Sequence, residues 1–270
     1  LGRVVIHLLE SNAGQILFEG RDVTHVDRRQ LTQLRKSMQM IFQDPYSSLN
    51  PRMSLFESIA EPLRIMGNFS PSQIRDQVYG IMKTVGLAER LVNTYPHELD
   101  GGRRQRIGIA RALVMNPQFV VCDEPVSALD VSIQAQILNL MCDIQEERRL
   151  TYIFVTHDLS VVKYISSDIL VMYLGQMVEM APTGELFEYR LHPYTKALLS
   201  AVPLPDIHHE KRRIELKGEL TSPIDPKPGC RFASRCPYAK DVCFRENPVS
   251  QQIRPGHFVS CHFVREINAL

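Results

Sequence analysis

The chain has 270 residues, of which 44% are hydrophobic, so it can bury a substantial core and is not a disordered polypeptide. Its 31 lysines and arginines balance 30 aspartates and glutamates, and no long basic block argues for a nucleic-acid surface. No apolar run approaches the roughly 18 to 20 residues that cross a bilayer, and we see no secretory signal. We therefore expect a cytosolic protein that meets any membrane through a partner.

The hydrophobic pattern predicts alternating strands and helices. Helices are predicted at residues 1–9, 28–36, 103–115 and 132–147, and strands at 15–18, 38–42, 119–122, 152–156 and 169–173. Between residues 51 and 90 apolar residues recur at helical spacing. Continuous apolar strands between helices predict an α/β fold with a mainly parallel sheet covered on both faces. After Val202 an irregular extension is marked by Pro203, Pro205, Pro223, Pro226 and Pro228.

Two carboxylates follow the apolar run at 119–122, namely Asp123 and Glu124. A buried parallel strand delivers them to the carboxyl end of the sheet, where open sheets bind ligands. An aspartate there can hold Mg²⁺ through its water shell, and a glutamate can orient a water that attacks a phosphate. His157 follows the next strand and could contact the same phosphate. Solvated acids and a helix-capping histidine are the alternatives.

A second candidate site opens the helix predicted at 103–115. Gly101 and Gly102 would let the first amides approach an anion, which the helix dipole favours there. Asp100 stands before the glycines and is also a good helix N-cap, and Arg103 is close enough in sequence to pair with it.

In this order, the motifs resemble those of the ABC ATPases. Residues 98–113 match the family's signature, and the remaining matches are Gln43 to the Q-loop, Asp123 and Glu124 to Walker B, 127–130 to the D-loop and His157 to the switch histidine. The resemblance implies ATP and Mg²⁺ as cofactors, hydrolysed in a nucleotide-sandwich dimer. It implies catalytic roles for Glu124 and His157, Mg²⁺ binding through water by Asp123, and nucleotide or dimer contacts by Gln43, Asp100, Gly101, Gly102, Arg103 and Asp130. Gln43 could otherwise be an exposed polar residue, and Asp130 a simple helix cap.

The same resemblance implies a P-loop NTPase-like core. It covers residues 1–182, with a helical subdomain inserted at about 53–98, and an extension with cysteines follows at 183–270.

Segments 46–52, 126–136 and 192–201 look like the ATP-binding subunits of oligopeptide and dipeptide ABC importers, and the resemblance covers essentially the whole chain. It implies a second ABC ATPase subunit and transmembrane permease subunits as partners, with an extracytoplasmic substrate-binding protein involved indirectly. The chain would lie at the cytoplasmic face of the plasma membrane. Peptides are the default cargo, although similar systems carry nickel chelates or glutathione. The rivals are a soluble ABC ATPase of DNA repair or translation and a non-catalytic, metal-binding remnant.

One departure from the family concerns the phosphate loop. No Gly-x-x-x-x-Gly-Lys-Ser/Thr motif occurs in the 270 residues. Residues 1–3 match the positions directly after that Walker A motif, so we expect a chain truncated at its amino end that binds ATP poorly and is inactive alone.

The other departure lies in the signature, where the family usually has Ser at position 100 and Gln at position 103. Ionised Asp100 cannot donate to a γ-phosphate, and it repels an anion about 4 Å away by about 4 kcal/mol before screening. A hydrogen bond is worth roughly 1 to 3 kcal/mol. We therefore expect a heterodimer in which the site completed by this signature is weakened, unless Arg103 compensates for the charge.

Six cysteines are present, and Cys122 and Cys142 fall in a predicted core strand and helix. The other four lie near the carboxyl end: Cys230, Cys236, Cys243 and Cys261. In a cytosolic protein such a group argues for metal over disulfides. Cys-x-x-Cys zinc knuckles are absent, and similar cysteine sets in peptide-importer ATPases are associated with a [4Fe-4S] cluster. Zinc or free thiols are the alternatives, and we expect His257 and His262 to be bystanders.

Overall fold

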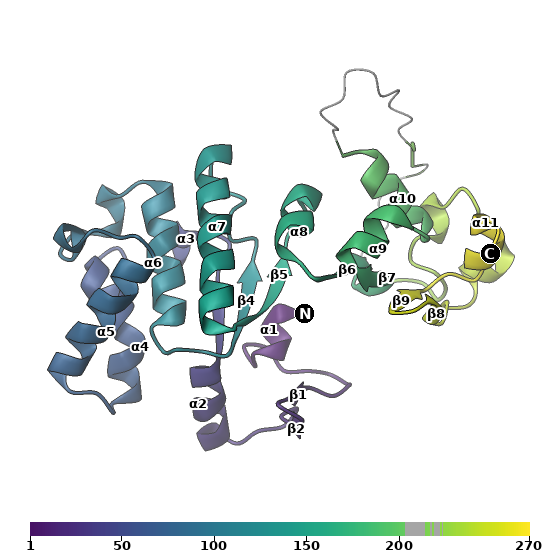
Figure 1. Cartoon of the computed structure of the whole chain (residues 1–270). Helices are drawn as coiled ribbons and strands as arrows, with labels where there is room; N and C mark the ends of the chain where they lie inside the picture. Colours follow the sequence, from purple (N-terminus) through teal and green to yellow (C-terminus); the bar gives the residue numbers. More distant parts are fainter. Residues whose placement is uncertain (203–213, 217, 219–221, 223) are drawn as a thin grey trace. The chain divides into compact units, whose positions relative to one another are not determined.

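The computed structural model describes residues 1–202, 214–216, 218, 222 and 224–270. The chain forms two compact units, Leu1–His157 and Asp158–Leu270 (Figure 1). This division falls earlier in the sequence than the predicted boundary after residue 182. Three prolines of the predicted irregular extension, Pro203, Pro205 and Pro223, lie outside the described residues.

A parallel sheet forms the centre of the first unit. Its order is β3-β4-β5, and its strands are β3 (Met38–Ile41), β4 (Phe119–Asp123) and β5 (Thr151–Val155). In register, Met40 pairs with Val121 and Val121 pairs with Ile153, and all three share one buried cluster with Ile6. Because side chains alternate between faces, Cys122 points to the other side, so both faces of β4 are buried. The central position of β4 places its carboxyl end between two neighbours.

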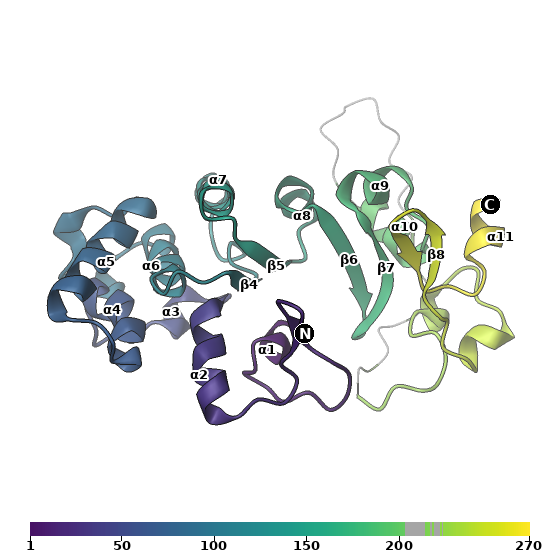
Figure 2. The same ribbon diagram turned by 60° about the horizontal axis from the view of Figure 1, so that its bottom comes forward.

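Helices flank this sheet. They are α1 (Gly2–Val5), α2 (Arg28–Ser37), α3 (Pro45–Ser48), α4 (Leu55–Met66), α5 (Pro71–Thr84), α6 (Gly101–Leu113) and α7 (Val131–Arg148), with 3₁₀ turns at Glu89–Leu91 and Pro96–Glu98. In Figure 2, α7 lies on one side of β4 and β5, and α1 and α2 lie on the other. A short hairpin joins β1 (Leu17–Phe18) to β2 (Arg21–Asp22). The predicted helices at 28–36, 103–115 and 132–147 are therefore present, with ends shifted by one or two residues.

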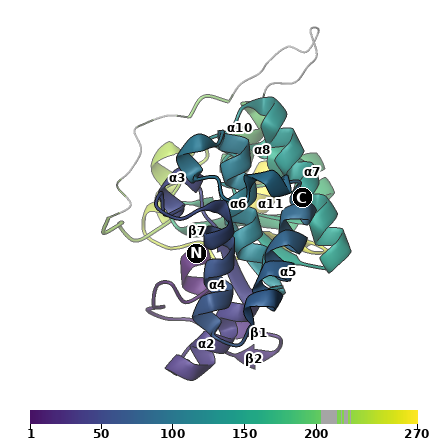
Figure 3. The same cartoon turned by 90° about the vertical axis from the view of Figure 1, so that its left-hand side faces the viewer.

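The helices α4 and α5 lie in the segment predicted as an inserted helical subdomain. Helix α4 packs against both α5 and α6 (Figure 3). Ser54 and Ser70 begin the two helices, and each is the first residue of a capping box. Gly67, with φ of 68°, ends α4 in the left-handed conformation that glycine favours. Both helices lie inside the segment predicted as helical from its apolar spacing.

Two predicted elements at the amino end are shorter than expected. The helix predicted at residues 1–9 spans only Gly2–Val5, because the chain turns at His7, whose φ is 57°. The strand predicted at 15–18 is confined to Leu17–Phe18.

The second unit is built on an antiparallel sheet of order β6-β7-β9-β8. Its strands are β6 (Asp168–Tyr173), β7 (Gln176–Pro182), β8 (Gln251–Arg254) and β9 (His257–Val259). The expectation that the strand at 169–173 belongs to a parallel sheet is wrong, because β6 pairs antiparallel with β7. A tight turn explains this, since Leu174 and Gly175 both have positive φ and join paired residues Tyr173 and Gln176.

Around this sheet lie short helices: α8 (Leu159–Ile165), α9 (Thr183–Glu188), α10 (Pro193–Ser200) and α11 (Val264–Asn268), with 3₁₀ turns at Ala233–Arg235 and Asp241–Phe244. The extension is thus more regular than predicted, because β8 and β9 complete the sheet. Pro255 and Gly256 join these strands, and Gly256 has φ of 71°, as the third residue of a type II turn requires. None of the helices within the described ranges is long and apolar enough to cross a membrane.

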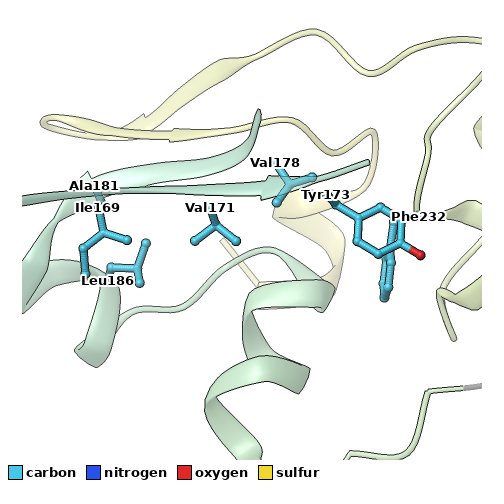
Figure 4. Close-up of a cluster of buried hydrophobic side chains, with 7 residues drawn as sticks. All are labelled: Ile169, Val171, Tyr173, Val178, Ala181, Leu186 and Phe232. Carbon is cyan, nitrogen blue, oxygen red and sulfur yellow. The ribbon is translucent and has the colours of Figure 1, made fainter. Parts of the chain in front are cut away.

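The core of the second unit follows the alternation of β6. Its inward side chains pack with those of β7, α9 and the cysteine-containing loop, and the buried cluster comprises Ile169, Val171, Tyr173, Val178, Ala181, Leu186 and Phe232 (Figure 4). Leu170 and Met172, between the inward residues, are exposed. The ring centroids of Tyr173 and Phe232 lie 5.2 Å apart at 83°, an edge-to-face pair. Phe232 therefore anchors the loop that carries Cys230 to the sheet.

Candidate active site

Glu124 is held in an unusual backbone conformation at the end of β4. Its φ is 45°, a left-handed value that costs a residue with a Cβ about 1 kcal/mol or more. The Glu124 N–H donates to the Val155 carbonyl at 2.8 Å, and the Ser127 hydroxyl donates to the Glu124 carbonyl at 3.1 Å. These bonds to the end of β5 and to the following turn fix where the Glu124 side chain leaves the backbone.

Two side chains contact the Glu124 carboxylate, one from the loop after β3 and one from the loop after β5. Gln43 Nε2 donates to Oε2 at 2.7 Å, and His157 Nδ1 lies 3.0 Å from Oε1. Gln43 follows β3 and His157 follows β5, so the parallel order of the three strands brings these residues together. The Glu124 side chain is 24% exposed and that of His157 is 76% exposed. A carboxylate oriented in this way can position a water at the open edge of the sheet.

Asp123, the last residue of β4, pairs with a residue that the sequence analysis did not single out. Its Oδ2 lies 3.6 Å from Nη2 of Arg3, which belongs to α1. Helix α1 reaches this position because Gly2 lies against β4, where a Cβ would stand 2.5 Å from Cγ1 of Val121. The available signal was the match of residues 1–3 to the positions after the family's phosphate loop. Arg3 therefore places a cation beside the carboxylate expected to face Mg²⁺.

The signature residues form a second cluster at the N-terminus of α6. The Asp100 side chain caps this helix, because its Oδ1 accepts the Arg103 N–H at 2.8 Å. Oδ2 of Asp100 lies 3.4 Å from Nε of Arg103. The carboxylate is thus both a cap and an ion-pair partner, and it lies where the helix dipole would attract an external anion.

Gly101 and Gly102 bring α6 close to the D-loop and α7. A Cβ on Gly102 would stand 2.7 Å from Cγ2 of Ile133, and one on Gly101 would stand 3.3 Å from Cδ2 of Leu129. Asp130 caps α7 by accepting the Ile133 N–H at 3.0 Å. The glycines are therefore needed for helix packing as well as for any approach of an anion.

The four cysteines near the carboxyl end line one cavity of about 20 Å³, together with His192 and Phe232. Burial raises the pKa of Cys261 to about 11, and the other thiols raise it further while the Phe263 amide lowers it. Burial also raises the pKa of Cys230 and that of Cys236, against nearby backbone amides. Among the described residues, no three His, Cys, Asp or Glu side chains converge as ligands of one metal ion. The four cysteines therefore line one cavity, but their sulfur atoms are not arranged as the ligands of a metal ion.

Gly229 shapes the loop beside this cavity. Its φ is 104°, and a Cβ there would stand 2.6 Å from the carbonyl oxygen of Cys243. The Cys230 N–H donates to this carbonyl at 2.8 Å. Only glycine lets these two cysteines approach through their backbones.

Cys122 and Cys142 belong to the first unit. Cys122 is fully buried in β4, and burial strongly raises the pKa of its thiol. Cys142 is partly buried on α7, and burial raises its pKa as well. The position of Cys122 agrees with the predicted core role, whereas Cys142 lies at the edge of the buried residues.

Two family models match the chain, "ABC transporter" at residues 1–127 and "Oligopeptide/dipeptide transporter, C-terminal region" at residues 178–243. The chain is 48% identical over 268 residues to the putative oligopeptide transport ATP-binding protein YkfD of Bacillus subtilis, covering 98% of this chain and 82% of that protein. It is 49% identical over 264 residues to the oligopeptide transport ATP-binding protein AppF of Bacillus subtilis and to OppF of Haemophilus influenzae, covering 97% of this chain and 80% of each relative.

Among solved structures, cbiO1 from Clostridium perfringens, part of the ABC transporter complex cbiONQ, has a TM-score of 0.63 and 28% identity, covering 70% of this chain and 73% of that one. The ATP-binding cassette MJ0796, in a dimeric post-hydrolysis state with ADP and Pi, has a TM-score of 0.60 and 27% identity, covering 67% of this chain and 78% of that one. The fold and these likenesses make the chain an ABC ATPase. Within that class, it belongs to the family of oligopeptide transport ATP-binding proteins.

Proposed function

We propose that this chain is the ATP-hydrolysing subunit that energises an ABC importer of peptides. The observation that carries the proposal is the Glu124 carboxylate, held between Gln43 and His157 at the carboxyl edge of the parallel sheet. The names of the relatives, oligopeptide transport ATP-binding proteins, support peptides as cargo. A DNA-repair or translation ATPase and a non-catalytic remnant receive no comparable support.

The roles of the site residues follow from this geometry. Glu124 orients the attacking water and accepts its proton, while Gln43 and His157 hold the carboxylate in place. Asp123 faces Mg²⁺ through water, which requires Arg3 to move aside from its position 3.6 Å away. When bound, Mg²⁺ neutralises charge on the phosphates of ATP.

The partners are a second ABC ATPase subunit and transmembrane permease subunits, with a substrate-binding protein acting indirectly. The chain would thus be peripheral to the cytoplasmic face of the plasma membrane. Asp130 is the N-cap of α7, and its match to the family's D-loop supports a contact across a nucleotide-sandwich dimer.

We further propose that this dimer is a heterodimer. The anion position at the N-terminus of α6 is filled by the chain's own Asp100 carboxylate, which accepts the Arg103 amide. A γ-phosphate presented by the partner subunit would meet this charge, only partly offset by the exposed Arg103. The site completed by this signature would therefore turn over slowly, while Glu124 serves the other site.

The proposed function predicts peptide-stimulated ATP hydrolysis. The test uses the chain in a form that carries a phosphate loop, assembled with its permease subunits in vesicles, and measures phosphate release with and without peptide. The 270-residue polypeptide without that loop should show no detectable ATP binding by calorimetry, because no lysine or loop amides cradle the phosphates. Stimulation by DNA ends or ribosomes in place of peptide would contradict the proposal, and so would micromolar ATP affinity of the polypeptide alone.

We also propose that Cys230, Cys236, Cys243 and Cys261 bind a [4Fe-4S] cluster. The thiols share one cavity, and backbone amides face three of them, as donors to metal-bound sulfur do. The cavity they line is small, about 20 Å³, and a single zinc ion is the alternative to the cluster.

Anaerobic purification of the full chain tests the cluster. We expect about four irons and four sulfides per chain and a visible absorption band. Cys261→Ser should lose both, whereas Cys142→Ser, in the other unit, should keep them. A colourless sample with one zinc per chain would show that the cysteines bind zinc and not the cluster. A sample without metal would exclude both.

A further inference from the structure

The carboxylate of Glu179 is fully buried in the second unit and belongs to no site described so far. Glu179 lies on β7, and its side chain is 0% exposed. A buried charge without partners costs several kcal/mol, so its neighbours show what it stabilises.

Three donors face the two oxygens of Glu179. Oε1 accepts the Leu191 N–H at 2.7 Å, and Oε2 accepts the His192 N–H at 3.0 Å. Oε1 also lies 2.8 Å from Nε2 of His257, a ring that is itself fully buried. One carboxylate thus joins the loop before α10 to the first residue of β9.

The network continues beyond His257 to the edge of the sheet. Nδ1 of His257 lies 3.4 Å from Oε1 of Glu185, and Nε of Arg254 lies 2.5 Å from the same oxygen. Both nitrogens of the imidazole therefore face carboxylates. His257, which we expect to be a bystander of the cysteines, links these two acids.

Both segments that Glu179 holds lead into the cysteine cavity. His192 lines the cavity, and its Nδ1 accepts the Tyr194 N–H at 3.1 Å. Burial lowers the pKa of His192 to about 4, so its ring is neutral at neutral pH and serves as a fixed cap of α10. On the other side, Glu179 pairs in register with Val259, and Cys261 follows two residues later.

We propose that Glu179 is the positioning residue of the cysteine cavity, holding one wall through the amides of Leu191 and His192 and the other through His257. That Glu179 positions the ligands of a metal site rests on the proposed function. That Glu179 limits the exposure of the four thiols does not. In Glu179→Gln the side chain has one acceptor oxygen in place of two, so one wall loses its bond.

The test measures alkylation rates of individual thiols by mass spectrometry in the metal-free full chain. Glu179→Gln should raise the rates of Cys230, Cys236 and Cys261 about tenfold relative to Cys142, since about 1.4 kcal/mol of lost local stability corresponds to tenfold easier opening. Cys142 lies in the other unit and is the internal reference for the alkylation conditions, whereas Cys122, which is fully buried there, reports unfolding of that unit. Glu188→Gln, an exposed glutamate of α9, is the matched control and should leave every rate unchanged.

His257→Asn separates the two walls. It keeps the amide bonds of Leu191 and His192, so its increase should be largest at Cys261. In the wild-type chain, the Leu191 and His192 amide hydrogens should exchange with solvent as slowly as those of β7, a measurement that needs no variant. Fast exchange of these two amides overturns the proposal, as do folded variants whose cavity thiols stay within about twofold of wild type. If the anaerobically purified wild type holds no iron or sulfide but the variants show the expected thiol pattern, the cluster is refuted and the role of Glu179 is supported.

Discussion

Replacing Glu124 by glutamine should lower ATP turnover of the assembled transporter by about 10²- to 10⁴-fold, the usual contribution of a general base. Glutamine has nearly the same shape but cannot accept the proton of the attacking water. Its amide can still bond to Gln43 and His157, which lie 2.7 and 3.0 Å from the present carboxylate, so the local structure should persist. The measurement is phosphate release at saturating ATP by a form that carries the phosphate loop.

Glu147→Gln is the matched control, because this glutamate lies on the exposed side of α7. It should leave turnover unchanged. If Glu124→Gln retained a third of wild-type turnover or more, Glu124 would not be the base. ATP binding measured on the same variant shows whether the loss lies in hydrolysis alone.

The double change Asp100→Ser with Arg103→Gln should raise turnover by about tenfold. It removes the repulsion of a phosphate by an exposed carboxylate, about 1 kcal/mol after screening, and adds a hydroxyl donor worth about 0.5 kcal/mol, which together correspond to about tenfold. Serine is also a good N-cap, so α6 should keep its N-terminus and the protein its stability. The measurement is steady-state ATP hydrolysis by the assembled transporter.

Asp100→Asn separates the two contributions of this change. Asparagine keeps the cap on the Arg103 amide, now 2.8 Å from the carboxylate, but carries no charge. It should give an intermediate rate. Equal turnover in all three proteins would show that Arg103 already compensates for Asp100 and would remove the argument for an asymmetric dimer.

The central strands could be predicted because their sequences are continuous and apolar. Strands β3, β4 and β5 lie within one residue of their predicted bounds, and β4, which is buried on both faces, gives a signal that does not depend on alternation. Parallel order then brings their carboxyl ends together. To predict that Gln43, Glu124 and His157 lie together at that edge, it was enough to know where the three strands end.

The sheet of the second unit was missed for a physical reason. Strand β7 carries Glu179, and a charged residue argues against a buried strand until its partner His257, distant in sequence, is known. The turn between β8 and β9 could be predicted, because Pro255-Gly256 is a turn signal. The ion pair between Arg3 and Asp123 could not be predicted from the sequence, because it depends on how closely α1 lies on β4.

The residue at position 229 indicates whether a related sequence can keep this arrangement of the cysteine loop. Any larger residue would drive the Cys243 backbone outward, since a Cβ has 2.6 Å to its carbonyl oxygen. A homologue that bears a side chain there must have abandoned this arrangement of sulfurs, even where all its cysteines persist. That single position can therefore sort sequences of the lineage into those that retain the arrangement and those that have lost it.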